Sequence, residues 1–173
     1  MERDEAVVGG GIRERIAELA QRVVADGTAQ GFTVAVAESL TGGLLAAAIT
    51  SVPGASVVFR GSVTAYATEI KASVLGVDAD LLAREGAVHP EVARQMADGV
   101  RRLFGATVGL ATTGVAGPTE QDGKPVGLVY VGYSSAVSGP SAEELHLNGD
   151  REAIRAQTVL RALELGVKGE DQR

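Results

Sequence analysis

Ser39 is the residue of this chain whose neighbours best suit it to act as a nucleophile. It follows a short apolar run, Val34 to Ala37, and precedes the glycines Gly42 and Gly43 at the start of a second apolar stretch. This order predicts a strand, a turn and a helix, and open α/β sheets bind ligands at the carboxyl ends of their strands. We therefore expect Ser39 at a ligand-binding edge. The backbone N–H groups near Thr41, Gly42 and Gly43 would stabilise developing negative charge there.

A serine hydroxyl is a weak nucleophile and needs a neighbouring base. The two histidines, His89 and His146, are not well placed in the sequence to supply one, so the candidates are the lysines Lys71, Lys124 and Lys168. Lys168 lies in a polar tail and is set aside. Lys71 follows Tyr66 and enters a predicted helix with apolar neighbours, where partial burial would lower its pKa as a base requires. The alternative is a Lys71 whose amine reaches solvent and pairs with Glu69 or Asp78.

The elements around these residues alternate between strand-like and helix-like patterns. Apolar spacing and capping residues predict helices from residue 12, over 44–49, 69–75 and 80–84, from residue 90 and after residue 150. Apolar or alternating runs predict strands over 32–37, 56–66, 106–112, 127–133 and 144–147. We expect a single-domain three-layer α/β/α sandwich with a mixed, mostly parallel central sheet. His89, before Pro90, is expected to cap a helix.

Length and composition limit the class of protein. The 173 residues are 45% hydrophobic, which suits one domain with a proper core, and we expect a flexible segment over 1–11, the domain over 12–166 and a polar tail over 167–173. A net charge of −6 without a Lys/Arg block argues against nucleic-acid or membrane partners. No cysteine and only two histidines, His89 and His146, predict no metal site. The polar N-terminus and the lack of a long apolar run predict a cytoplasmic protein.

The loop over 113–124 is the best candidate for binding an anion. It is rich in glycine and other turn-forming residues, and successive backbone N–H groups in such turns form anion-binding concavities. Its candidate binding residues are Thr113, Gly114, Ala116, Gly117 and Lys124. Arg151 would add a second positive charge. Alternatively, Arg151 is a surface partner of Asp150 or Glu152.

Motifs in order along nearly the whole chain resemble the CinA C-terminal domain family. They are Glu-Ser-Leu-Thr-Gly-Gly at 38–43, Tyr66 with Lys71, the segment 86–97, Thr-Gly-Val-Ala-Gly-Pro at 113–118, Lys-Pro-Val-Gly at 124–127 and Gly-Asp-Arg-Glu-Ala-Ile-Arg at 149–155. Characterised members of this family hydrolyse the amide of nicotinamide mononucleotide. The resemblance therefore implies a nicotinamide-nucleotide amidase.

The same resemblance implies roles for particular residues and partners. Ser39 would be the nucleophile, Lys71 the base and Tyr66 a relay or orienting group. Glu38 would lie among the residues that bind substrate. A pyridine nucleotide would be the small-molecule ligand, no cofactor would be needed, and the chain would form a homodimer or a higher homo-oligomer.

Two other functions stay open from the sequence: a nucleotide-binding module without catalysis, and an interaction protein of the competence or damage-inducible type. One departure from the family pattern is the segment 119–122, where Glu120 and Asp122 would repel a phosphate. Thr68 is a competing hydroxyl for Lys71, but we expect it to be poorly exposed inside a helix.

Overall fold

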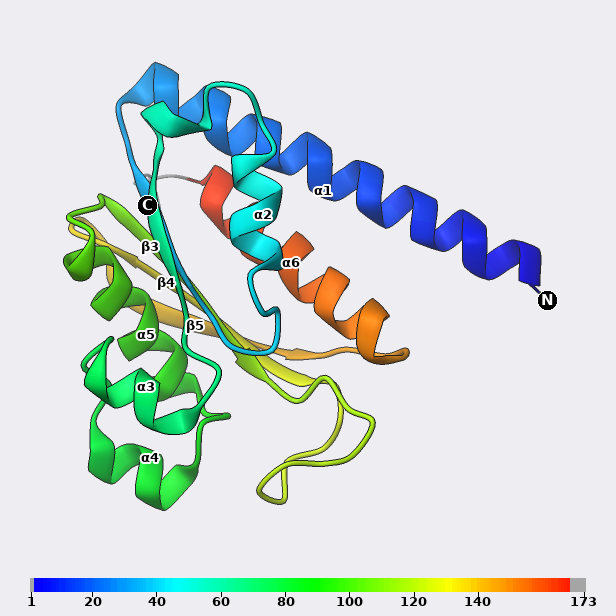
Figure 1. Cartoon of the computed structure of the whole chain (residues 1–173), viewed down its shortest axis with the longest axis vertical. Coiled ribbons are helices and arrows are strands. Elements are labelled where there is room, and N and C mark those ends of the chain that lie inside the picture. The colour runs from blue at the N-terminus through cyan, green and yellow to red at the C-terminus, as the bar shows by residue number, and fades with distance from the viewer. Residues whose placement is uncertain (1, 169–173) are drawn as a thin grey trace.

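A five-stranded sheet lies between two layers of helices (Figure 1), so the predicted three-layer α/β/α sandwich is confirmed. The computed structural model describes the backbone of residues 2–168 and the side chains of residues 11–168. The strands are β1 (Val34–Glu38), β2 (Phe59–Thr64), β3 (Val108–Gly114), β4 (Leu128–Ser135) and β5 (Gly139–His146). Their order in the sheet is β2-β1-β3-β4-β5, with β2, β1 and β3 parallel and the pairs β3–β4 and β4–β5 antiparallel.

Helices cover both faces of the sheet (Figure 1). One layer holds α1 (Glu2–Gln30), α2 (Leu44–Thr50) and α6 (Arg151–Val167), and the other holds α3 (Thr68–Ser73), α4 (Ala79–Glu85) and α5 (Pro90–Leu103). A short 3-10 helix over Ala55–Val57 precedes β2. Strands β1 and β4 are buried along their whole length. This burial explains their continuous apolar sequences, because helices cover both of their faces.

Helix α5 packs against the sheet at backbone distance. A Cβ atom at Gly132 of β4 would lie 2.2 Å from the carbonyl oxygen of Ala93, and one at Gly109 of β3 would lie 2.1 Å from that of Ala97. Only glycine allows this approach. The contact fixes the position of α5, and with it the segment 86–89 that leads into the helix and borders the site described below.

The structure moves several predicted boundaries. Helix α1 begins at Glu2 rather than at Ile12, so the glycines at 9–11 lie within a helix despite their low helix propensity. Strand β2 begins at Phe59 because Ala55–Val57 form the 3-10 helix. Strand β5 begins at residue 139, earlier than predicted. The prediction began too late because an edge strand with one solvated face lacks a long apolar run.

Two predicted helix caps are confirmed. The Asp150 side chain accepts a hydrogen bond from the N–H of Ala153 at 2.8 Å, and His89 Nδ1 accepts one from the N–H of Glu91 at 3.2 Å. Of the predicted C-terminal tail, Val167 ends α6 and residues 169–173 lie outside the described residues, as does residue 1 of the predicted N-terminal segment. In the described part of the chain, no helix combines the length and apolar character needed to cross a membrane.

Candidate active site

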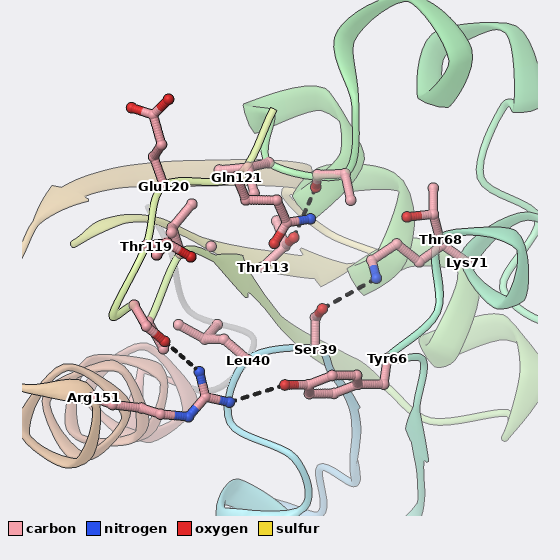
Figure 2. A pocket seen from close by; sticks show the side chains of 16 residues that line it. Ser39, Leu40, Tyr66, Thr68, Lys71, Thr113, Thr119, Glu120, Gln121 and Arg151 are labelled. Atoms are coloured by element: carbon pink, nitrogen blue, oxygen red, sulfur yellow. Dashed lines mark hydrogen bonds between the residues drawn. The ribbon is translucent and has the colours of Figure 1, made fainter. Parts of the chain in front are cut away.

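Ser39 and Lys71 meet at the carboxyl end of β1. The N–H of Ser39 donates to the carbonyl oxygen of Thr112 at 3.0 Å, which extends the pairing between β1 and β3 by one residue and anchors the serine at the sheet edge. Lys71 comes from α3, and its Nζ donates to Ser39 Oγ at 3.1 Å and to the carbonyl oxygen of Ala65 at 2.6 Å (Figure 2). The structure therefore brings together the predicted nucleophile and the predicted base.

The Lys71 side chain is completely buried, with 0% of its surface exposed. Burial lowers the pKa of Lys71 from 10.5 to about 8, and the nearby carboxylate of Glu69 opposes this effect only in part. The alternative of an amine that reaches solvent is therefore wrong. At pH 7 about a tenth of such an amine is neutral and able to accept a proton.

Glu38 is the second buried ionisable side chain at this edge, with none of its surface exposed. Its Oε2 accepts hydrogen bonds from the N–H groups of Gly43 at 3.1 Å and Leu45 at 3.0 Å, and its Oε1 accepts one from Ala46 at 2.8 Å. The carboxylate thus caps α2 from the end of β1. The implied placement of Glu38 among the substrate-binding residues is corrected, because both of its oxygens face the helix start.

This cap also corrects the predicted oxyanion donors. The N–H of Gly43 is bound to Glu38, and the N–H of Gly42 donates to the carbonyl oxygen of Ser39 at 3.1 Å. Thr41 is buried, with its Oγ1 2.8 Å from the Oγ1 of Thr112. Two of the three predicted donors are therefore occupied by the protein itself.

A cavity of about 270 Å³ opens in front of Ser39. Its lining comes from five segments of the chain: Ser39 and Leu40; Tyr66, Thr68 and Lys71; Ala87 and Val88; 113–117 with Thr119, Glu120 and Gln121; and Arg151. The predicted residues Thr113, Gly114, Ala116 and Gly117 all line it. Lys124 does not, because its backbone pairs with that of Gln121 and closes the tip of the loop.

Sequence reasoning missed three residues of this lining, Leu40, Ala87 and Val88. The sequence did indicate Ala87 and Val88, because they fall in the motif segment 86–97. Thr68 also lines the cavity and is exposed, so its predicted place inside a helix is wrong; α3 begins at this residue.

Arg151 closes one side of the cavity. Its Nη1 donates to the carbonyl oxygen of Gly117 at 2.7 Å, and its Nη2 donates to the Tyr66 hydroxyl at 2.9 Å (Figure 2). Both acceptors are neutral, and within the described residues Arg151 forms no ion pair. The surface alternative is wrong, because Asp150 caps α6 and Glu152 pairs with Arg13 at 2.9 Å. Arg151 thus keeps its positive charge for an anionic ligand.

Tyr66 is 59% exposed, and Figure 2 shows its hydroxyl directed toward Arg151 rather than toward Lys71. This geometry suits a Tyr66 that orients Arg151. The hydroxyl makes no direct contact with Lys71 through which it could relay a proton. Glu120 points away from Ser39 and from Arg151 in the same view. Its carboxylate therefore does not enter the space in which an anion would meet Arg151.

Arg155 contacts the turn that follows the nucleophile. Its Nε donates to the carbonyl oxygen of Leu40 at 2.9 Å, and its Nη2 donates to that of Thr41 at 3.0 Å. Sequence reasoning did not select Arg155, although it ends the motif segment 149–155. Among the side chains of residues 11–168, no group of three or more His, Asp or Glu is arranged to hold a metal ion.

Fold and site together define a three-layer α/β domain with a serine and a buried lysine in one cavity at the carboxyl edge of its parallel strands. The model of the CinA C-terminal domain matches residues 16–168, and the chain belongs to this family.

Known relatives agree with this assignment. A CinA-like protein of Frankia casuarinae is 56% identical over 133 residues, which cover 77% of this chain and 30% of that protein. The chain spans about a third of the length of the curated relatives that it matches. The crystal structure of the competence/damage inducible protein CihA from Agrobacterium tumefaciens is similar with a TM-score of 0.83, 38% identity and coverage of 87% of this chain and 92% of that one. A CinA superfamily protein from Klebsiella pneumoniae matches with a TM-score of 0.84, 34% identity and coverage of 88% and 96%.

Proposed function

We propose that this chain is an amidase that hydrolyses the carboxamide of nicotinamide mononucleotide to nicotinate mononucleotide and ammonia. The observation that carries the proposal is the 3.1 Å contact between Lys71 Nζ and Ser39 Oγ at a cavity of about 270 Å³. A buried lysine whose pKa is lowered to about 8 suits a general base near neutral pH. Family membership agrees with a hydrolase, and the specific substrate is part of the proposal.

In the first half of the reaction, the neutral amine of Lys71 accepts the proton of Ser39 while Oγ attacks the carboxamide carbon. The carbonyl oxygen of Ala65 accepts one N–H of the amine, which leaves the nitrogen lone pair available to Ser39. The protonated amine then transfers its proton to the amide nitrogen as the C–N bond breaks. Ammonia leaves, and the acyl group remains on Ser39 as an ester.

In the second half, water attacks the ester carbon and gives a proton to Lys71. The C–O bond to Ser39 breaks, the lysine returns a proton to the serine oxygen, and the acid product leaves. The pair is thereby restored, with one water consumed and one ammonia released. No group beyond Ser39, Lys71 and water has to move a proton in this scheme.

The cavity suits a phosphorylated ligand at its other end. Arg151 carries a positive charge without a carboxylate partner in the described residues, and its guanidinium is held in place by Gly117 and Tyr66. The backbone of the 113–117 segment lines the space between Arg151 and Ser39. Buried apolar side chains of Leu40, Val88 and Val115 provide contacts for an aromatic ring.

A binding or interaction role of the competence/damage-inducible kind, as the relatives' names suggest, is the alternative. The buried amine favours catalysis, because burying a lysine costs folding free energy that a binding module has no need to expend. The test is the formation of ammonia and nicotinate mononucleotide by the purified chain beside Ser39→Ala and Thr68→Ala. We expect turnover in the parent and in Thr68→Ala and none in Ser39→Ala. Nucleotide binding by calorimetry without ammonia release would support the binding role instead.

A further inference from the structure

The backbone N–H groups around the nucleophile differ in whether the protein already uses them. Those of Ser39, Gly42 and Gly43 donate to Thr112, Ser39 and Glu38, respectively. Within the described residues, the N–H groups of Leu40 and Thr41 donate to no protein acceptor. Leu40 is 4% exposed and lines the cavity, whereas Thr41 is buried and does not line it. A backbone N–H at a cavity wall that has no protein acceptor is available to water or to a ligand atom.

The Leu40 N–H lies on the side of the turn opposite to the hydrogen bond that closes the turn. The carbonyl oxygen of Ser39 accepts the N–H of Gly42, and the peptide bond between Ser39 and Leu40 is trans. In a trans peptide the C=O and N–H bonds point in opposite directions. The Leu40 N–H therefore points out of the turn, one residue from the nucleophilic oxygen.

Arg155 holds this turn from α6. Its guanidinium donates to the carbonyl oxygens of Leu40 and Thr41, and within the described part of the chain it forms no ion pair. Gly42 permits this approach, because its φ is +60° and a Cβ atom there would lie 3.3 Å from Arg155 Nη2. The half-buried guanidinium of Arg155 is thus bound to two backbone carbonyl oxygens beside the nucleophile.

We propose that the N–H of Leu40 binds the oxyanion formed when Ser39 attacks a carbonyl carbon, and that Arg155 is a positioning residue that fixes this N–H. The inference rests on the proposed function, because it assumes that Ser39 is acylated. It replaces the predicted donors Gly42 and Gly43, whose N–H groups the protein already uses.

The direct test replaces the N–H of Leu40 with an ester oxygen by incorporating the α-hydroxy analogue of leucine. The side chain stays unchanged and only the donor is lost. The probe is p-nitrophenyl acetate, with p-nitrophenolate release and mass mapping of the acetylated Ser39 peptide as readouts. We expect the acylation rate to fall by roughly 100-fold or more. The pH midpoint of the reaction should stay at that of the parent, because Lys71 is intact.

The second test compares Arg155→Ala with Arg161→Ala. Arg161 lies on the same helix and is bound to Glu143 and Glu164, remote from the turn, so its loss controls for a merely structural effect. With the amide substrate, Arg155→Ala should lower kcat by roughly tenfold to 100-fold with little change in KM, and added guanidinium or Arg155→Lys should restore part of the loss. Arg161→Ala should leave kcat near that of the parent.

Each outcome separates the two claims. A parent chain that is not acylated at Ser39 overturns the proposed function and this inference with it. A parent that is acylated, with an ester variant acylated equally fast, overturns this inference alone. Equal losses of kcat in Arg155→Ala and Arg161→Ala would remove the positioning role of Arg155.

Discussion

The Nζ atom of Lys71 lies 3.1 Å from the Oγ atom of Ser39, although 32 positions separate the two residues in the chain. Their contact depends on two features of the fold. Strand β1 ends directly before Ser39, and α3 begins shortly after the parallel neighbour β2. Because the carboxyl ends of β1 and β2 lie at the same edge of the sheet, the serine and the lysine reach one cavity from adjacent connections.

The rate of Ser39 acylation should rise with pH through about 8, because only the neutral amine of Lys71 accepts the serine proton and burial lowers its pKa to that value. Lys71→Arg should abolish acylation over the whole range, since an arginine stays protonated. Stopped-flow measurement of acylation by an activated ester between pH 6 and 10 gives the acylation rates of the parent and of Lys71→Arg. Lys168→Arg at the end of α6 is the control and should reproduce the parent profile. A profile that stays flat through pH 8 would argue against Lys71 as the base.

The buried amine should also make the stability of the fold depend on pH. Between about pH 8 and 10.5 the unfolded chain keeps the Lys71 proton and the folded chain has lost it, so the free energy of unfolding rises with pH in this window. Its slope approaches about 1.4 kcal/mol per pH unit at its steepest. Below about pH 8 both states are protonated, and this contribution no longer changes.

Urea unfolding of the parent and of Lys71→Met, repeated from pH 7 to 11, isolates this effect. Other groups titrate in both proteins and cancel in the difference, so the parent should gain stability relative to the variant as the pH rises. If the free energies of unfolding of the parent and the variant change in parallel with pH, the amine of Lys71 is solvated in the folded protein.

Glu38→Gln should destabilise the fold, because an amide NH₂ replaces one of the oxygens that accept the N–H groups of Gly43, Leu45 and Ala46. A buried donor that loses its acceptor costs about 1–3 kcal/mol. The start of α2 follows the nucleophile by a few residues, so acylation of Ser39 should slow as well. Glu14→Gln, exposed on α1, is the matched control and should change stability by less than about 0.5 kcal/mol. Equal urea midpoints for the two variants would show that the Glu38 cap is dispensable.

Arg151→Ala should remove the preference for a phosphorylated substrate. A charge-assisted hydrogen bond contributes about 1.5–3 kcal/mol, so kcat/KM for nicotinamide mononucleotide should fall by roughly tenfold to 100-fold. Nicotinamide riboside, which has no phosphate, should be turned over about as slowly by the variant as by the parent. Arg22→Ala removes one exposed positive charge from α1 and controls for net charge. An equal loss with nucleotide and nucleoside would place the phosphate elsewhere.

Strand and helix periods predicted the sandwich, because they are local patterns, whereas the Ser39–Lys71 pair was implied by motifs that resemble those of the CinA C-terminal domain family. The sequence left the burial of Lys71 open, since a lysine near the end of a short helix is as easily solvated as buried. Its burial follows from contacts that form only in the folded chain, where its Nζ binds Ser39 Oγ and the carbonyl oxygen of Ala65.

Two of the three oxyanion donors, Gly42 and Gly43, were predicted wrongly for a similar reason. Two glycines at a helix start are typical of an anion site, but here the anion is the protein's own Glu38 carboxylate. Its neighbour Ser39 faces the cavity, while Glu38 turns back to α2. The pairing of Arg155 with the turn was equally hidden, because its acceptors are backbone carbonyls 114 and 115 positions away.

The most direct test of the Ser39–Lys71 amidase is capture of the acyl-enzyme during turnover of nicotinamide mononucleotide. The reaction is quenched in acid within the first turnover, digested and analysed by mass spectrometry, with Ser39→Ala run beside the parent. We predict a nicotinate mononucleotide ester on the Ser39 peptide of the parent, together with released ammonia, and neither in the variant. Ammonia release that continues in Ser39→Ala, or an ester found on Thr68 instead, would contradict the assignment of Ser39 as the nucleophile.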